Sequence, residues 1–333
     1  MTSLILQRTI LVSVLLILSS NLFAASRNCT KEEREQGNTI LLATQSSGQA
    51  RSDILNRHMP FGIHQSASAD DSESILYQNG YVMSHDKDLR TALWVSYRLT
   101  HEDISAAKGK DRVNCFRTDP RFDDADTAKK SDYDEPTYDQ GHLANDADMK
   151  DDLLEQINTY VMSNMSPQHC RFNRGIWLSL EHLTRIWASS DRYRNLLVTS
   201  GAIFNRDMVD GRDTDDESLR MTSRNGKQRV AIPSHYFKTI LRQDEDGWKS
   251  ISFLLKHDND DDGVKWLEVK PDVIGSIVSI EDIEQLSGYL LHPSLNRGQI
   301  SQGIDGEEWD FDEGESNFNG GIKDNNKCVT SVE

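Results

Sequence analysis

The residues from Tyr138 to Leu143, with the sequence YDQGHL, could carry acid–base chemistry. Gly141 directly precedes His142, and a glycine lets the backbone bend so that the imidazole can approach a substrate. Histidine titrates near neutral pH, so His142 is a candidate general base. A histidine on its own is more often a structural or surface residue, so this cluster needs support from a second one.

A second polar cluster follows between Asn173 and Ala188, where the sequence predicts a helix. Its periodicity predicts one buried apolar stripe, formed by Ile176, Leu180, Leu183 and Trp187. At about 100° per residue, Asn173, Glu181 and Arg185 lie beside that stripe and can face one cleft. A continuous helix separates Asn173 from Glu181 by about 12 Å, so direct ligation of one ion by both is not expected. Magnesium suits this spacing because it keeps several waters. The alternative is a plain amphipathic helix with polar edges.

Taken together, the two clusters form an ordered set of motifs. DQGH occupies Asp139–His142, SNMSPQ occupies Ser163–Gln168, and NRGIWLSLE occupies Asn173–Glu181. This set resembles the sugar-non-specific DNA/RNA endonucleases, relatives of mitochondrial endonuclease G with a ββα-metal active site, whose pattern is DRGH, then SNxxPQ, then N-x-G-x-W-x-x-LE and an arginine. Other segments resemble the family in the same order: PFGIH, LWVSYRLT, FRTDPR, VTSGAIF, VAIPSHYFK and SIEDIEQLSGYLL.

The resemblance implies a role for each matching residue. His142 would be the general base that takes a proton from the attacking water, and Asn173 would be the one direct protein ligand of Mg²⁺, with Mn²⁺ as an alternative metal. Glu181 would hold waters around the metal, Arg185 would contact the phosphate, and Asn164 would support the site by hydrogen bonding. The implied activity is phosphodiester hydrolysis of DNA and RNA that leaves 5′-phosphates. Little sequence preference is expected, because such a site reads no base edges.

Gln140 departs from the family pattern, which has arginine at this position. A guanidinium binds phosphate with two charged hydrogen bonds, whereas glutamine offers a neutral contact. The loss corresponds to about 1 to 3 kcal/mol of binding or transition-state stabilisation. We expect an active enzyme. The alternative is a catalytically weakened nuclease-fold protein that binds nucleic acid or another partner.

The ends of the chain and its cysteines bear on its location. The first 25 residues contain the apolar block from Ile10 to Leu18, followed by small residues, and predict a secretory signal rather than a membrane anchor. The chain is therefore expected to be secreted, extracellular or periplasmic, with no membrane association. In that setting we expect two disulfides, of undecided pairing, among Cys29, Cys115, Cys170 and Cys328. The oligomeric state is left open, with a homodimer as one option.

The distribution of charge qualifies the formal net charge of −17, which taken alone argues against a nucleic-acid substrate. Residues 164–206 contain six arginines and two acids, so basic residues concentrate around the candidate site. Residues 296–333 contain three basic and nine acidic residues and predict a loosely packed acidic tail. The simple interpretation of this tail is a solvating extension. The sharper hypothesis is that Glu307 to Glu315 competes with nucleic acid for the basic face.

Strand and helix patterns predict an α+β fold with an antiparallel or mixed central sheet and flanking helices. We divide the chain into a signal (1–25), an N-terminal extension (26–59), a catalytic domain (60–295) and the tail (296–333). A hairpin with a type I′ turn is predicted at Asn79–Gly80, and a helix capped by Ser279 is predicted to end at Gly288. Further strands are predicted at residues 91–100, 195–204, 227–233, 235–243 and 249–257. The acidic segments 207–217 and 257–263 are interpreted as loops, although the second nearly fits a calcium-binding pattern.

Overall fold

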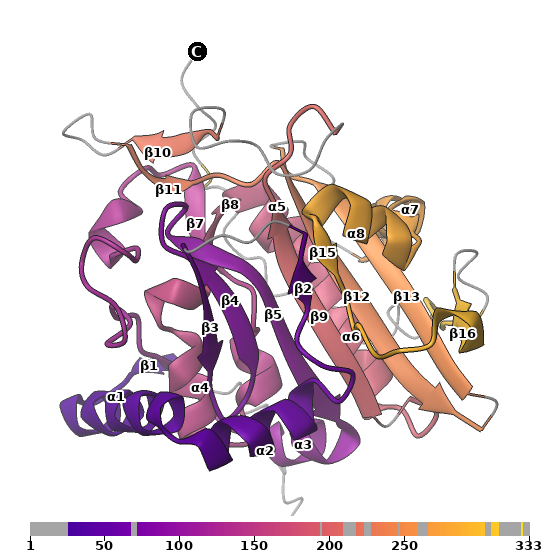
Figure 1. Ribbon diagram of the computed structural model, residues 1–333, viewed down its shortest axis with the longest axis horizontal. Coiled ribbons are helices and arrows are strands. Elements are labelled where there is room, and N and C mark those ends of the chain that lie inside the picture. The colour runs from indigo at the N-terminus through magenta and orange to yellow at the C-terminus, as the bar shows by residue number, and fades with distance from the viewer. Residues whose placement is uncertain are drawn as a thin grey trace, which may run out of the picture.

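The computed structural model describes residues 26–67, 72–193, 195–208, 218–222, 228–245, 247–258, 266–303, 308–312 and 328. In this part of the chain, eight strands form a central sheet in the order β14-β13-β12-β9-β5-β4-β3, with β16 pairing in parallel to β13 (Figure 1). The other neighbours are antiparallel, so the predicted α+β fold with an antiparallel or mixed sheet is confirmed. The strands are β3 (Glu73–Tyr77), β4 (Val82–Asp86), β5 (Thr91–Thr100), β9 (Asn195–Ile203), β12 (His235–Asp244), β13 (Gly247–Lys256), β14 (Ile277–Val278) and β16 (Ile300–Gln302).

The middle of the sheet is covered on both faces. In β5 the alternating residues predicted to be apolar, such as Leu93 and Tyr97, are buried, but Trp94 and Ser96 on the other face are buried as well. Arg98 is the exposed exception in this strand. A strand buried on both sides needs layers of structure above and below it.

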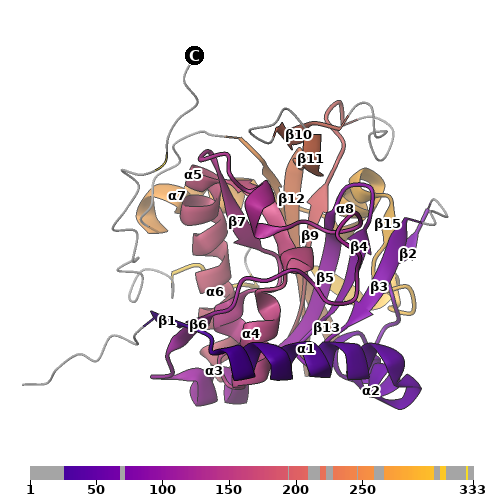
Figure 2. The same cartoon turned by 90° about the vertical axis from the view of Figure 1, so that its left-hand side faces the viewer.

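These layers are visible in Figure 2, where β7, α4 and α6 lie on one side of the sheet and α8, β15 and β2 lie on the other. The helices are α1 (Lys31–Ser46), α2 (Gly48–His58), α3 (His101–Ala107), α4 (Leu153–Thr159), α5 (Cys170–Phe172), α6 (Leu178–Ser189), α7 (Trp266–Gly275) and α8 (Ile280–Ser287). The short strands outside the main sheet pair as β1 (Ser26–Asn28) with β6 (Arg112–Asn114), β2 (Gln65–Ser66) with β15 (Tyr289–Leu290), β7 (Tyr138–His142) with β8 (Met165–His169), and β10 (Arg220–Thr222) with β11 (Gln228–Ala231).

Two local predictions have different outcomes. Helix α8 begins after Ser279, whose hydroxyl accepts from the Asp282 amide, and ends at Gly288 in the left-handed region (φ 73°), as predicted. The β3–β4 hairpin is also confirmed, but its predicted type I′ turn is wrong because neither Asn79 nor Gly80 has a positive φ. Close packing favours glycine at position 80 instead, since a Cβ there would lie 2.8 Å from the Met149 sulfur and this side chain would have to shift.

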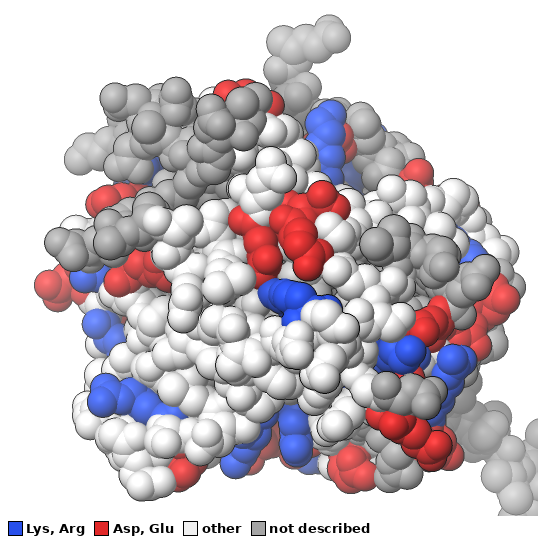
Figure 3. Space-filling model, turned by 45° about the vertical axis from the view of Figure 1, so that its right-hand side comes forward, with Lys and Arg blue, Asp and Glu red and all other residues white. Residues whose placement is uncertain are grey.

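Charged side chains of both signs are scattered over the face shown in Figure 3. Neutral residues fill most of this face, and the coloured residues form no broad basic patch on it. This side of the molecule therefore offers no extended surface for a polyanion among the residues described.

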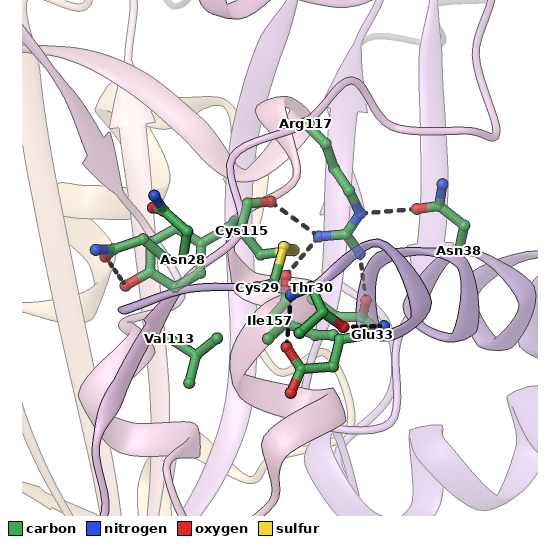
Figure 4. Close-up of a disulfide and its surroundings, with 12 residues drawn as sticks. Asn28, Cys29, Thr30, Glu33, Asn38, Val113, Cys115, Arg117 and Ile157 are labelled. Atoms are coloured by element: carbon green, nitrogen blue, oxygen red, sulfur yellow. Dashed lines mark hydrogen bonds between the residues drawn. A yellow bond between two sulfur atoms is a disulfide. The ribbon is translucent and has the colours of Figure 1, made fainter. Parts of the chain in front are cut away.

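The N-terminal residues are tied to the domain by a disulfide and a buried arginine. Cys29 is bonded to Cys115, with 5.2 Å between their Cα atoms (Figure 4). Strand β1, which ends just before Cys29, pairs with β6, which ends just before Cys115. The guanidinium of Arg117 donates to the Asn38 side chain (2.7 Å) and to the Ile157 carbonyl (2.6 Å), and so joins α1 to α4. The N-terminal extension (residues 26–59) is therefore packed against the domain and holds β6 in place.

The second disulfide joins Cys170, at the start of α5, to Cys328, with their Cα atoms 5.7 Å apart. The prediction that the four cysteines form two disulfides is confirmed, and the pairing left open by the sequence is 29–115 and 170–328. The second bond fastens Cys328 to the segment that follows β8.

Residues 308–312 also pack against the domain, so the expectation of a loosely packed tail is wrong for them. Trp309 is 3% exposed and stacks on Tyr193 with ring centroids 5.5 Å apart. Arg242 lies over the same indole, 4.4 Å from the ring centroid. The aromatic residues of the sequence EWDFD supply enough apolar surface to hold this acidic segment. Glu308 pairs with Lys249 (2.8 Å) and does not reach the candidate site, so the described residues give no support to competition with nucleic acid.

No helix in the described part of the chain has both the length and the apolar character needed to cross a membrane. Several predictions concern residues outside the described ranges. These are the signal at 1–25, most of the acidic loop at 207–217, and residues 259–263 of the segment that resembles a calcium loop.

Candidate active site

The site is built on a two-stranded hairpin followed by a helix. Strands β7 and β8 pair antiparallel, with His142 opposite Met165 and Asp139 opposite Gln168. Gly141 is required here because a Cβ would collide with the side chain of Gln168 on the neighbouring strand. The chain then passes through α5 into α6, so two strands and a helix bring the two predicted clusters together.

The helix that carries the second cluster is broken, contrary to the prediction of one continuous helix from Asn173 to Ala188. Residues Asn173–Trp177 form a widened turn in which Gly175 is not helical (φ −104°, ψ −109°), and α6 begins at Leu178. The predicted apolar stripe is nevertheless buried, at Ile176, Leu180, Leu183 and Trp187. Because the helix is interrupted between Asn173 and Glu181, the rise of a regular helix no longer sets their separation.

His142 ends β7 and lines a cleft, although its side chain is 9% exposed. Its Nε2 atom is buried without a hydrogen-bond partner in the described structure. The Tyr160 ring lies edge-on, with 4.7 Å between ring centroids. Burial lowers the pKa of His142 to about 4, partly offset by the charge of Asp146. The imidazole is therefore neutral at pH 7, the form that can accept a proton.

Asp139 holds the two residues at the start of the widened turn. Asn173 donates its side-chain amide to Asp139 Oδ2 (2.9 Å), which fixes the orientation of the amide and identifies its oxygen as the atom available to a cation. Arg174 donates from Nε to Oδ2 (2.8 Å) and from a terminal nitrogen to Oδ1 (2.7 Å) of the same carboxylate. Asp139 thus ties strand β7 to Asn173 and Arg174.

Glu181 lies deeper, on α6, and is 6% exposed. Burial raises the pKa of Glu181 to about 7, although the charges of Lys238 and Arg185 favour its ionised form. Lys238 on β12 is fully buried, donates to the Ser200 hydroxyl (2.5 Å) and lies 4.7 Å from the centre of the Trp177 indole ring. A carboxyl group with a pKa near neutrality in a cleft is typical of a functional site.

Arg185 lies one helical turn beyond Glu181 and also lines the cleft. Its guanidinium donates to Asp148 Oδ1 (3.0 Å), and Tyr97 donates its hydroxyl to the other oxygen of the same carboxylate (2.6 Å). Asp148 is 3% exposed, so a buried carboxylate holds the Arg185 guanidinium in position.

Asn164 lies outside the residues that line the cleft. Its side chain is fully buried, accepts from the Ala144 amide (2.9 Å), and donates to the carbonyls of Ala144 (3.0 Å) and Thr159 (2.8 Å). These bonds hold the backbone just after His142. The structure therefore places Asn164 as a support for the His142 strand.

The cleft has a volume of about 410 Å³ and brings together five of the six predicted site residues. Those five are Gln140, His142, Asn173, Glu181 and Arg185. Among the described residues that line it, four basic side chains face two acidic ones, despite the negative charge of the whole chain. The basic residues are Arg112, Lys150, Arg174 and Arg185, and such an excess attracts phosphate groups.

Sequence reasoning missed one wall of the cleft. Arg112 and Phe116 flank the Cys29–Cys115 disulfide, and Arg112 bonds to the Tyr160 hydroxyl (2.7 Å) and pairs with Asp146 (3.2 Å). The FRTDPR segment, which begins at Phe116, resembles the family and is the available signal for this wall. The resemblance alone does not say that the segment lies beside the cleft.

Replacing Glu181 with glutamine is expected to remove a pH-dependent part of the stability. The folded protein keeps a proton on Glu181 up to about pH 7, whereas an unfolded glutamate releases it near 4.5. This stabilisation is present below pH 4.5 and is lost as the pH rises to about 7. At about 1.4 kcal/mol per pKa unit, the change is about 3 kcal/mol.

Urea unfolding in EDTA between pH 4.5 and 7 measures this effect as the difference between wild type and Glu181→Gln. Titration of the buried histidines is common to both proteins and cancels. The exposed Glu32→Gln is the matched control and should show a flat difference. A flat difference for Glu181→Gln as well would contradict the raised pKa.

Comparison with known proteins agrees with the architecture and with the motifs. The chain is 28% identical over 245 residues to the mitochondrial nuclease EXOG of Danio rerio, covering 72% of this chain and 66% of that protein. It is 28% identical over 220 residues to human mitochondrial endonuclease G, covering 66% of this chain and 69% of that protein. A chain in a crystal structure of an EndoG/EndoGI complex superposes with a TM-score of 0.55 at 23% identity, covering 73% of this chain and 93% of that chain, and so shares the fold. The pattern that defines the DNA/RNA non-specific endonucleases matches residues 62–298, well over half of the chain, so the protein belongs to this family of hydrolases.

Proposed function

We propose that this protein is a secreted, Mg²⁺-dependent endonuclease that hydrolyses DNA and RNA with little sequence preference and leaves 5′-phosphates. The observation that carries the proposal is the cleft itself. It combines the neutral imidazole of His142, the oriented amide of Asn173 and an excess of basic side chains. A site of this composition can address the phosphodiester backbone, which all nucleic acids share.

The donor set of the cleft fits a hard divalent cation. Asn173 would bind it through the side-chain oxygen, and Glu181 would act through intervening waters. When bound, Mg²⁺ supplies Lewis-acid stabilisation of the charge that develops on the phosphate and on the leaving 3′ oxygen. Mn²⁺ is proposed as an alternative, because it also prefers oxygen ligands.

The protein's own residues divide the remaining work. His142 accepts the proton of the attacking water on its imidazole ring, and Asp146 stabilises the imidazolium that results. Arg185, fixed by Asp148, binds the phosphate. Asn164 holds the backbone that follows His142, and Asp139 orients Asn173. The bond between phosphorus and the 3′ oxygen breaks, so the phosphate stays on the 5′ oxygen of one product, and the leaving 3′ oxygen takes a proton from water and becomes the 3′ hydroxyl of the other.

Secretion is proposed on separate grounds. The apolar block at residues 10–18 supports an export signal, and two disulfides are typical of proteins that fold in oxidising compartments.

The test is incubation of the protein without its first 25 residues with supercoiled plasmid and total RNA, in Mg²⁺, in Mn²⁺ and in EDTA. We expect both substrates to be degraded in either metal and to be intact in EDTA, and the product ends to be 5′-phosphates by ligation before and after phosphatase treatment. Well-folded protein that binds DNA without cutting it would instead support the weakened, binding-only alternative that Gln140 suggests. Absence of both cleavage and salt-dependent binding would reject a role with nucleic acid.

A further inference from the structure

Lys238 is a buried basic residue that the proposed mechanism does not use. It lies in β12, is fully buried, and is not among the residues that line the cleft. Its ammonium group donates to the hydroxyl of Ser200 (2.5 Å), the residue opposite it on β9. Lysine is almost never fully buried unless neighbouring groups stabilise its charge. The groups around Lys238 therefore indicate what its charge acts on.

The face of β12 that carries Lys238 contacts the start of α6. Tyr236, two residues earlier on the same face, lies against Trp177 with ring centroids 5.5 Å apart. The Lys238 ammonium nitrogen lies 4.7 Å from the centre of the same indole ring. Trp177 directly precedes α6 and has helical backbone angles, so Glu181 follows it by one turn on the same side of the helix. The ammonium group therefore approaches Glu181 from the sheet.

Lys238 has the largest effect of the charges that act on Glu181, and it favours the ionised carboxylate. Arg185, on α6 itself, acts in the same direction, but its guanidinium is bonded to Asp148 (3.0 Å), whose charge acts in the opposite direction. The other groups that interact with Glu181 from packed elements are Asn145, Tyr97 on β5, and Arg112 on β6, which is paired with Asp146. Because the charges of Arg185 and Asp148 oppose each other, Lys238 is the cation that balances Glu181.

We propose that Lys238 is a positioning residue of the active site, whose buried charge keeps the Glu181 carboxylate ionised in the cleft. This inference rests on the proposed nuclease function, in which Glu181 acts on the cation through intervening waters. An ionised carboxylate accepts hydrogen bonds from such waters with both oxygens, whereas a protonated carboxyl group also has to donate one. Lys238 acts on the site only through Glu181.

The first test uses no metal and no substrate. Wild type, Glu181→Gln, Lys238→Met and the double variant are compared by urea unfolding in EDTA between about pH 4.5 and 9. Methionine is flexible and apolar, and it fills the buried space without a charge. In wild type, the stability that Glu181 contributes falls with rising pH and levels off above about pH 7. Between Lys238→Met and the double variant, the same difference should level off about one pH unit higher, because a neighbouring cation that lowers the pKa of Glu181 is gone.

Lys249→Met is the matched control. It removes a lysine from the neighbouring strand β13, where Lys249 pairs with Glu308 (2.8 Å). In that background the Glu181 difference should level off at the same pH as in wild type.

The double variant also decides the outcome if Lys238→Met does not fold at pH 7. A buried carboxylate without its counter-charge is strongly destabilising, so removing that charge in Lys238→Met/Glu181→Gln should restore folding. A double variant that is equally unfolded would show a packing defect and would reject the inference.

The second test connects Lys238 to cleavage. The Mg²⁺ concentration needed for half-maximal cleavage of a duplex DNA is measured at pH 7 and at pH 9. An upward shift of one unit lowers the ionised fraction of Glu181 at pH 7 from about a half to about a tenth. Lys238→Met should therefore raise the Mg²⁺ requirement about fivefold at pH 7 and leave it nearly unchanged at pH 9.

Two outcomes would overturn the inference while leaving the proposed function intact. One is a Glu181 difference that levels off at the same pH with and without Lys238. The other is a loss of activity in Lys238→Met that is equal at pH 7 and pH 9, which would give the lysine a purely structural role. If wild type fails to cleave, the proposed function is contradicted, and the unfolding measurements still decide whether Lys238 keeps Glu181 ionised.

Discussion

Replacing His142 with alanine is expected to lower kcat on plasmid DNA and on RNA by on the order of 10³-fold, while the affinity for DNA changes little. The neutral imidazole lines the cleft, and no other histidine is among the described residues that do so. Alanine leaves no side chain to accept the proton of the attacking water. The His142 ring packs against Tyr160, so its truncation leaves a small cavity, and circular dichroism checks that the variant is still folded at the assay temperature.

His169→Ala is the matched control for this experiment. His169 lies on the same hairpin, at the end of β8, and is not among the residues that line the cleft. The cleavage rate of His169→Ala should stay close to that of wild type, because this side chain is not among those that line the cleft. Added imidazole should restore part of the rate of His142→Ala. Retention of full activity by His142→Ala would remove this histidine from the mechanism.

Loss of the Asn173 side chain is expected to have an effect of similar size. Asn173→Ala should lower kcat/KM by on the order of 10³-fold and raise the Mg²⁺ concentration needed for half-maximal rate. The reason is that Asn173 is the proposed direct ligand, oriented by its bond to Asp139 (2.9 Å). Rates as a function of Mg²⁺ and isothermal titration of the metal without DNA measure the two parts separately.

The bond between Asn173 and Asp139 also allows a sharper form of this test. Asn173→Asp keeps an oxygen ligand but places a carboxylate against the carboxylate of Asp139, so we expect it to be impaired as well. The second change, Asp139→Asn, restores a donor and an acceptor in that pair and should recover part of the metal affinity. Equal metal affinity in wild type and Asn173→Ala would reject Asn173 as a ligand.

The parts of the fold that local sequence determines could be predicted. The strand patterns at residues 91–100 and 235–243, the cap at Ser279 and the stop at Gly288 depend on neighbouring residues, and the structure contains all of them. The residues of the cleft could also be predicted where they lie in short motifs. His142 and Asn173 were predicted to meet, and they line one cleft.

Contacts between distant segments could not be predicted in this way. Arg112 reaches the cleft because β6 pairs with β1 and is fastened by the Cys29–Cys115 disulfide, and neither contact leaves a local pattern. Lys238 lies in a strand that the sequence predicts, but its approach to Glu181 depends on the packing of α6 on the sheet. A loose tail was expected from composition, whereas the aromatic contacts of Trp309 decided otherwise.

The interruption at Gly175 could not be read from the sequence either, since the apolar stripe continues through it. It divides the site residues into two groups along the chain. Asn173 and Arg174 are bonded to strand β7 through Asp139, whereas Glu181 and Arg185 lie on α6, beyond the break. A substitution at Gly175 would therefore change the position of Asn173 relative to Glu181 and leave both the hairpin and α6 formed. Because the rate depends on how precisely the reacting groups are placed, such a substitution is expected to lower activity more than stability.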